Sequence, residues 1–191
     1  MNKLMSKLTG LVVIALITLS FTTIKENEKA INIKESKIGW IGKKITGQHT
    51  GNINFTSGNL IFKKDKLVGG SFVVDMTSIE VTDLQGEYKG KLEGHLKSDD
   101  FFGVDKFATS TLVFTKVKEA KGNYSVTADL TIKGITESVN FDMVVSANSA
   151  NASLKVDRTK YGIRYGSASF FDDLKNKAID NEFELNVSLK F

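Results

Sequence analysis

The chain has 191 residues, of which 41% are hydrophobic and 25% charged, and it contains neither Cys nor Pro. These proportions are typical of a globular domain and exclude global disorder, while the lack of Cys excludes disulfides, c-type haem attachment and thiolate metal sites. The formal net charge of +4 is spread along the chain without basic runs interleaved with aromatic residues, so nucleic-acid binding has no support.

The N-terminus has the pattern of an export signal. Lys3 and Lys7 precede an apolar run at residues 8–21, and no acidic residue interrupts this segment. The run is shorter than the ~20 residues that span a bilayer as a helix. We therefore expect a signal peptide at residues 1–24, one domain at residues 25–191, and a periplasmic or extracellular location. An uncleaved membrane anchor is the alternative.

Most of the remaining chain alternates apolar and polar residues with a period of two, which predicts strands with one buried face. The clearest alternation lies at residues 124–132, 139–145 and 183–191. Weaker alternation marks Ile31/Ile33, Ile38/Trp40, Ile53/Phe55, Leu60/Phe62, Phe72/Val74/Met76, Leu112/Phe114 and Leu154/Val156. Turns are expected at "TSGN", "KKDKLVGG", "EAKGN" and "SANSAN". Together these signals predict about eight short antiparallel strands, closed as a barrel or stacked as a sandwich.

Two segments break this alternation. "DLQGEYKGKLEGHLKS" places Leu84, Tyr88, Leu92 and Leu96 four residues apart, which predicts a helix with one apolar stripe. Three glycines weaken this helix, so we expect packing of the stripe to hold it. "SASFFDDLKNKAID" predicts a second short helix capped by Ser169, or an ordered loop.

Four stretches carry a resemblance to a known family. They are "SKIGWIGKKITGQHTGNINFTSGNLIF", "GGSFVVDMTSIEVTD", "GHLKSDDFFGVDKFATSTLVFT" and "ADLTIKGITESVNFDM". Over residues 28–191 the chain resembles the YceI-like family, although Ala108 follows Phe107 where the family commonly has Pro. The resemblance implies an all-β, eight-stranded antiparallel lipocalin-like barrel with one or two short inserted helices. It also implies an elongated apolar pore that binds a polyisoprenoid or another amphiphilic lipid.

This resemblance makes inward-facing residues candidates for contact with a bound lipid. They are Trp40, Phe55, Phe62, Phe72, Met76, Phe101, Phe102, Phe114, Leu130, Phe141, Met143 and Tyr165. Arg158 and Arg164 are the only arginines, and the planar guanidinium suits a pyrophosphate or quinone head group. The structural alternatives are core packing for Trp40 and an ion pair or a surface position for the arginines. A pore and a filled core give the same alternation, so both stay open.

Catalytic and metal sites find little support in the motifs. His95 with Asp99 and Asp100 could ligate a metal, but no H-E-x-x-H spacing and no G-x-S-x-G elbow is present. We instead expect His95 to end the first helix, Ser98 to Asp100 to form a capped turn, and the following Phe101 and Phe102 to border the barrel.

The leading hypothesis is therefore an exported, non-enzymatic carrier of a polyisoprenoid or quinone-type lipid, without a further cofactor. The partners it implies are the lipid and a transient membrane contact, and a homodimer stays open. One alternative is an envelope stress or interaction protein with a filled core. Another is an enzyme that acts on a lipid.

Overall fold

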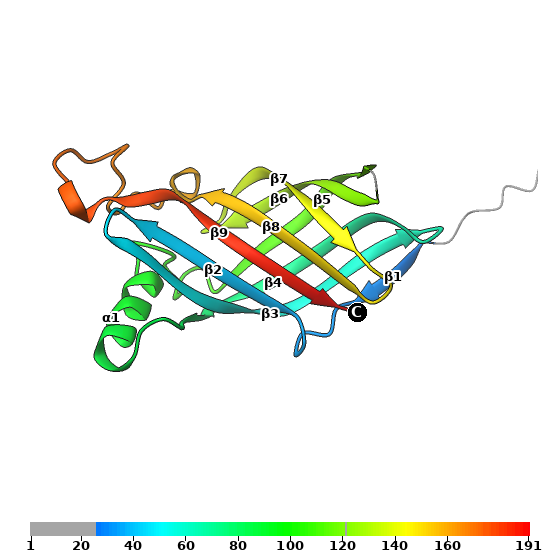
Figure 1. Cartoon of the computed structure of the whole chain (residues 1–191), viewed down its shortest axis with the longest axis horizontal. Coiled ribbons are helices and arrows are strands. Elements are labelled where there is room, and N and C mark those ends of the chain that lie inside the picture. The colour runs from blue at the N-terminus through cyan, green and yellow to red at the C-terminus, as the bar shows by residue number, and fades with distance from the viewer. Residues whose placement is uncertain (1–25, 121) are drawn as a thin grey trace, which may run out of the picture.

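The computed structural model describes residues 26–120 and 122–191, so the predicted signal peptide at residues 1–24 lies outside the described residues. The described chain forms one nine-stranded antiparallel sheet, eight strands of which close into a barrel (Figure 1). The strands are β1 Asn27–Ala30, β2 Lys37–Lys44, β3 Gly47–Lys63, β4 Lys66–Val81, β5 Thr109–Ala120, β6 Asn123–Ile132, β7 Ile135–Val145, β8 Ser149–Asp157 and β9 Ile179–Lys190. The predicted eight-stranded antiparallel barrel is confirmed.

The barrel closes through a pairing between its first and last strands in the sequence. From β2 to β9 each strand pairs with its neighbour in the chain, and β9 also pairs with β2, with Trp40 opposite Leu185. The additional strand β1 pairs with the distal half of β3. Alternation places the apolar side chains of all eight barrel strands toward one enclosed core.

A bulge in β3 replaces one turn that the sequence predicts. Ile53 and Phe55 are buried at odd positions, whereas Leu60 and Phe62 are buried at even positions of the same strand. The register with β4 shifts between Phe55 and Ser57, which exchanges the two faces of the strand. The predicted turn at "TSGN" is therefore wrong, because the two segments form one strand of 17 residues.

A second irregularity in β4 involves the Asp-x-x-Ser-Ile motif. Asp75 Oδ1 accepts hydrogen bonds from the Thr77 amide at 2.9 Å and the Thr77 hydroxyl at 2.6 Å. The Ser78 hydroxyl donates to the Asp75 carbonyl at 2.6 Å and accepts from the Asn54 amide at 2.9 Å. These side chains replace ladder bonds where the strand bulges. The bulge lets Met76 and Ile79 both enter the core although they are three residues apart.

The ladder between β7 and β8 is short and leaves an opening in the barrel wall. The two strands pair only at Asp142–Val145 with Ala150–Ser153. Beyond this ladder, the 3₁₀ helix η1, Arg158–Tyr161, packs against β7 and β9. Tyr161 and Ile163 are almost completely buried there. The segment after β8 therefore fills this part of the wall and brings Arg158 into the barrel.

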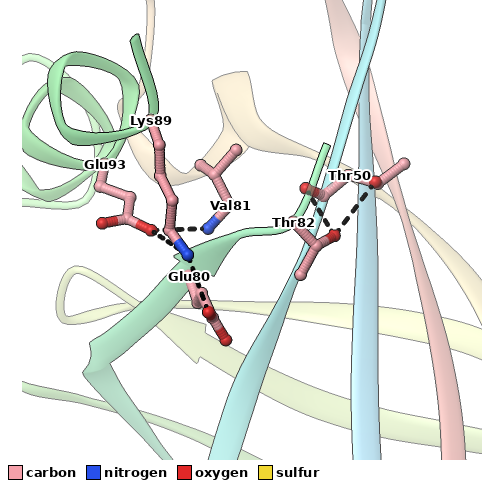
Figure 2. Close-up of polar contacts among 6 residues, drawn as sticks. All are labelled: Thr50, Glu80, Val81, Thr82, Lys89 and Glu93. Atoms are coloured by element: carbon pink, nitrogen blue, oxygen red, sulfur yellow. Dashed lines mark hydrogen bonds and ion pairs between the residues drawn. The ribbon is translucent and has the colours of Figure 1, made fainter. Parts of the chain in front are cut away.

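The predicted first helix is α1, Gly86–Lys97, but it is not held as expected. Tyr88 is 75% exposed, and of the predicted stripe Leu96 packs against the core. Polar contacts tie α1 to the end of β4 instead (Figure 2). Glu93 Oε1 accepts a hydrogen bond from the Val81 amide at 2.9 Å, and Lys89 Nζ lies 2.9 Å from Glu80 Oε1.

The second predicted helix is reduced to the 3₁₀ turn η2, Lys175–Lys177, within the loop between β8 and β9. The β8–β9 loop comprises residues 158–178. It and α1 lie at the same end of the barrel, which we call the helix end (Figure 1). Among residues 26–120 and 122–191, no helix has the length and hydropathy required to cross a membrane.

Candidate functional site: two adjoining apolar cavities

Two cavities lie end to end inside the barrel. The helix-end cavity encloses about 140 Å³ and is lined mainly by strand residues, together with Leu96 of α1, Phe101 and Phe102 of the turn after it, and Arg158 of the β8–β9 loop. The central cavity encloses about 80 Å³ and is lined almost entirely by strand residues. Five residues line both cavities and separate one from the other: Ile38, Val74, Ser110, Leu130 and Leu185.

The turn after α1 forms one wall of the helix-end cavity. The Ser98 amide donates to the Gly94 and His95 carbonyls, and the Ser98 hydroxyl also donates to the His95 backbone carbonyl, at 2.8 Å. This cap ends the helix, and Phe101 and Phe102 then line the cavity. The predicted capped turn and the position of Phe101 and Phe102 at the barrel border are confirmed.

Two of the residues weighed as metal ligands, His95 and Asp99, lie in other contacts. The His95 ring packs edge-on against Phe101 and Tyr165, with centroid distances of 5.0 and 4.5 Å, and its buried Nε2 has no hydrogen-bond partner among the described residues. Asp99 pairs with Lys106 at 2.7 Å, and this hydrogen bond together with the positive charge lowers the pKa of the Asp99 carboxyl. His49, the other histidine, lies on β3, and its Nδ1 is hydrogen-bonded to Asp83 Oδ2 at 2.8 Å. No group of three potential metal ligands occurs in the part of the chain that the structure describes.

Trp40 lines the helix-end cavity because its neighbour on β3 is a glycine. Trp40 pairs with Gly51, and a Cβ at that position would lie 2.4 Å from two atoms of the indole. The missing side chain thus provides the space for the ring. The indole nitrogen is buried and has no hydrogen-bond partner among the described residues.

Arg158 is a buried cation beside the same cavity. It is 3% exposed, and it donates three hydrogen bonds to the backbone carbonyls of Asp180, Ile163 and Ile179 at 2.9–3.1 Å. Burial lowers the pKa of its guanidinium, while Asp157 and Asp180 act in the opposite direction. Arg158 forms no ion pair within residues 26–120 and 122–191.

Tyr161 marks the opening between β7 and β8. A shallow groove of about 250 Å³ runs along this opening and is lined by Tyr161 together with Glu137 and Lys155. The Tyr161 hydroxyl is buried without a hydrogen-bond partner among the described residues. Burial, with smaller contributions from Glu137 and Asp157, raises the pKa of Tyr161 to about 12.

The structure brings most of the predicted ligand-contacting residues together around the cavities. The helix-end cavity is lined by Trp40, Met76, Phe101, Phe102, Leu130 and Arg158. The central cavity is lined by Phe55, Phe72, Phe114, Leu130, Phe141 and Met143.

Three predicted residues line neither cavity. Phe62 packs on Phe191 at the opposite end, with a centroid distance of 5.8 Å. Arg164 lies over the Phe170 ring at 4.7 Å in the β8–β9 loop. Tyr165 is 47% exposed and covers His95 from outside the cavity.

Several lining residues were not among the predicted ones. Phe183, Leu185, Val187 and Leu189 line the cavities from β9, and their alternation in "EFELNVSLKF" was a sufficient signal. Ser110 gave no such signal, because a serine at the start of a strand is common. It is 7% exposed, and its hydroxyl has no hydrogen-bond partner in the described part of the chain.

Comparison with known proteins gives a consistent family assignment. Residues 29–191 match the family described as the YceI-like domain. UPF0312 proteins of Staphylococcus aureus strains USA300 and MSSA476 are 41% and 40% identical over 87 residues, which are 40% of this chain and 48% of theirs. The chain thus spans about half the length of the curated relatives it matches.

Solved structures show the same fold at low sequence identity. BcnA of Burkholderia cenocepacia has a TM-score of 0.69 at 20% identity, covering 83% of this chain and 98% of its own. A polyisoprenoid binding domain from Saccharophagus degradans, implicated in plant cell wall breakdown, has a TM-score of 0.60 at 15% identity, covering 84% and 95%. The Campylobacter jejuni YCEI protein has a TM-score of 0.52 at 15% identity, covering 100% and 92%.

Proposed function

This chain belongs to the YceI-like family, and from that premise we propose that it is an exported binding protein that holds a polyisoprenoid lipid inside its barrel. The observation that carries the proposal is the pair of end-to-end cavities with almost wholly apolar walls. The structural similarity to a polyisoprenoid binding domain supports the same ligand class. The protein shields and releases the lipid and performs no chemistry on it.

The cavity walls favour a branched apolar chain on energetic grounds. Burial of one five-carbon isoprene unit contributes roughly 4 kcal/mol at about 0.8 kcal/mol per carbon. An apolar protein cavity of roughly 150 Å³ accommodates benzene, so the helix-end cavity of about 140 Å³ fits about one such unit. A longer chain requires that the apolar residues between the cavities change rotamer and join the two spaces. Ile38, Val74, Leu130 and Leu185 are these residues.

The first test is native mass spectrometry of the mature protein purified from its own host. A co-purified species of several hundred daltons that organic solvent releases, identified as a prenyl lipid, would support the proposal. A bare protein mass that persists after incubation with prenyl lipids would refute it and favour the filled-core interaction protein.

A matched pair of variants separates binding in the barrel from adsorption to its surface. Val74→Phe places a phenyl ring between the two cavities. Val113→Phe makes the same change on the outer face of β5, where Val113 is 47% exposed. We expect Val74→Phe to weaken prenyl-lipid binding about tenfold or more and Val113→Phe to leave it unchanged. Equal affinities for the two variants would contradict a site inside the barrel.

The β8–β9 loop offers a contact through which the lipid is exchanged with a membrane. It exposes the aromatic residues Tyr165, Phe170 and Phe171 at the helix end of the barrel, each 46–50% exposed. Exposed aromatic side chains favour the membrane interface. Phe170→Ser with Phe171→Ser should reduce co-sedimentation with lipid vesicles while bound lipid is retained. Unchanged co-sedimentation would show that the exposed phenylalanines of the loop do not mediate the membrane contact. Export and a homodimer stay predictions from the sequence.

A further inference from the structure

We propose that the ligand binds with its polar end in the helix-end cavity, and that this end presents hydrogen-bond acceptor oxygens without N–H donors, as an ester or ketone does. The inference rests on the proposed function and specifies the orientation and head-group chemistry of the bound amphiphile. It is based on three donor groups from different elements, Ser110 of β5, Trp40 of β2 and Arg158 of η1, all of which line that cavity.

Ser110 supplies a buried hydroxyl at the junction of the two cavities. Its side chain lines both spaces, it is 7% exposed, and its Oγ has no hydrogen-bond partner among the described residues. A buried hydroxyl without a partner is destabilising, because it has lost its hydrogen bonds to water. A ligand oxygen at this position would remove this destabilisation, because it would accept the hydroxyl proton.

Trp40 and Arg158 supply groups that can only donate. The indole N–H of Trp40 is buried and lacks a partner in the described chain. The Arg158 guanidinium has five N–H groups. Three of them bond to backbone carbonyls, so Nη1 and Nη2 each retain one further N–H. The complement to these donors is an acceptor.

The charged residues of the helix-end lining other than Arg158 are paired or exposed. Lys43 pairs with Glu184 at 2.6 Å, and Asp180 and Glu182 are exposed residues of β9. An uncharged acceptor can pair with the three donor groups without the desolvation cost of burying an anion in an apolar cavity. In contrast, the polar groups of the central cavity are limited to Ser110 and Thr111, which makes that cavity the place for the tail.

The test compares three probes with the same fifteen-carbon chain: farnesyl acetate, farnesylamine and the hydrocarbon farnesene. Affinities are measured by native mass spectrometry and calorimetry for the wild type, Ser110→Ala and Trp40→Phe. Ser153→Ala, at an exposed position of β8, is the matched control. Because the Ser110 hydroxyl has no partner, Ser110→Ala should be at least as stable as the wild type. The Ser110→Ala measurement therefore still tests the proposal if Trp40→Phe does not fold.

We expect farnesyl acetate to bind the wild type at least about tenfold more tightly than farnesene or farnesylamine. Ser110→Ala and Trp40→Phe should each weaken farnesyl acetate about three- to tenfold, as the loss of one hydrogen bond does, and leave farnesene unchanged. Equal affinities for the three probes, or variants that weaken acetate and hydrocarbon alike, would overturn the head-group site and leave the proposed function standing. A folded protein that binds none of the probes would overturn both.

Discussion

A single methyl group at Gly51 is expected to destabilise the barrel, because the space for its Cβ is already occupied. The Cβ of Gly51→Ala would lie 1.9 Å from the Glu80 carbonyl oxygen and 2.4 Å from Cε2 and Cζ2 of Trp40. Normal contacts between such atoms are about 3.5–4.0 Å. The carbonyl belongs to the backbone of β4, so relief requires that β3 and β4 separate or that the indole moves.

The size of this effect follows from overpacking in a closed core. Insertion of one methyl group into a tightly packed site costs about 1–3 kcal/mol, and contact with backbone on one side and a ring on the other places Gly51→Ala near the upper limit. For a domain of this size, about 3 kcal/mol lowers Tm by roughly 6–12 °C. Gly90→Ala is the matched control, because Gly90 lies inside α1 with no atom within 4 Å of its added Cβ. It should raise stability by about 1 kcal/mol.

Urea denaturation followed by tryptophan fluorescence measures both changes. Trp40 is the only tryptophan, so its emission reports unfolding and also the displacement of the indole in the folded protein. We expect opposite signs for the two glycine variants, together with a shifted native emission for Gly51→Ala alone. A stability of Gly51→Ala within about 0.5 kcal/mol of the wild type would refute the reasoning.

Two further substitutions test buried polar groups. The pKa of Tyr161 is about 12 in the folded protein against an ordinary value of 10.0, so folding retains the proton and stability should fall as pH rises from about 10 to 12. Tyr161→Phe should flatten this fall, measured by urea denaturation at several pH values, whereas Tyr88→Phe at an exposed position should not; parallel profiles would contradict the assignment. Glu93→Ala leaves the buried amide at the end of β4 without a partner, so it should cost about 1–3 kcal/mol. Glu87→Ala on the exposed face of α1 should have little effect on Tm, and a similar loss for both would show that the β4 contact is unimportant.

The closed barrel could be predicted from the sequence, because the alternation of apolar and polar residues indicates which side chains face inward. Tyr124 to Ile132 and Phe183 to Phe191 supplied complete inward faces, and the structure places them in the core. Alternation does not reveal a bulge, because "TSGN" contains the same small residues as a turn. The sequence therefore predicts two strands where the structure has one, from Gly47 to Lys63.

The candidate site was predictable in its apolar residues but not in its polar ones. Phe55 and Phe62 both point into the core from β3, yet only Phe55 borders a cavity, because the position of a residue along the barrel axis is set by pairing with distant strands. Arg158 and Arg164 are six residues apart in one segment. One is buried by carbonyls from β9 and the other lies on the surface, and this difference depends on tertiary contacts alone.

The pairing of β9 with both β8 and β2 has a consequence for the order of folding. β9 follows the other eight strands of the described chain, so it is synthesised after them, and it supplies wall residues to both cavities. Until it inserts, β2 and β8 have free edges and the apolar interior faces water, a state that is prone to aggregation. The two enclosed cavities therefore form only after β9 has emerged and paired, so the proposed ligand must be acquired by the closed barrel and not by the growing sheet.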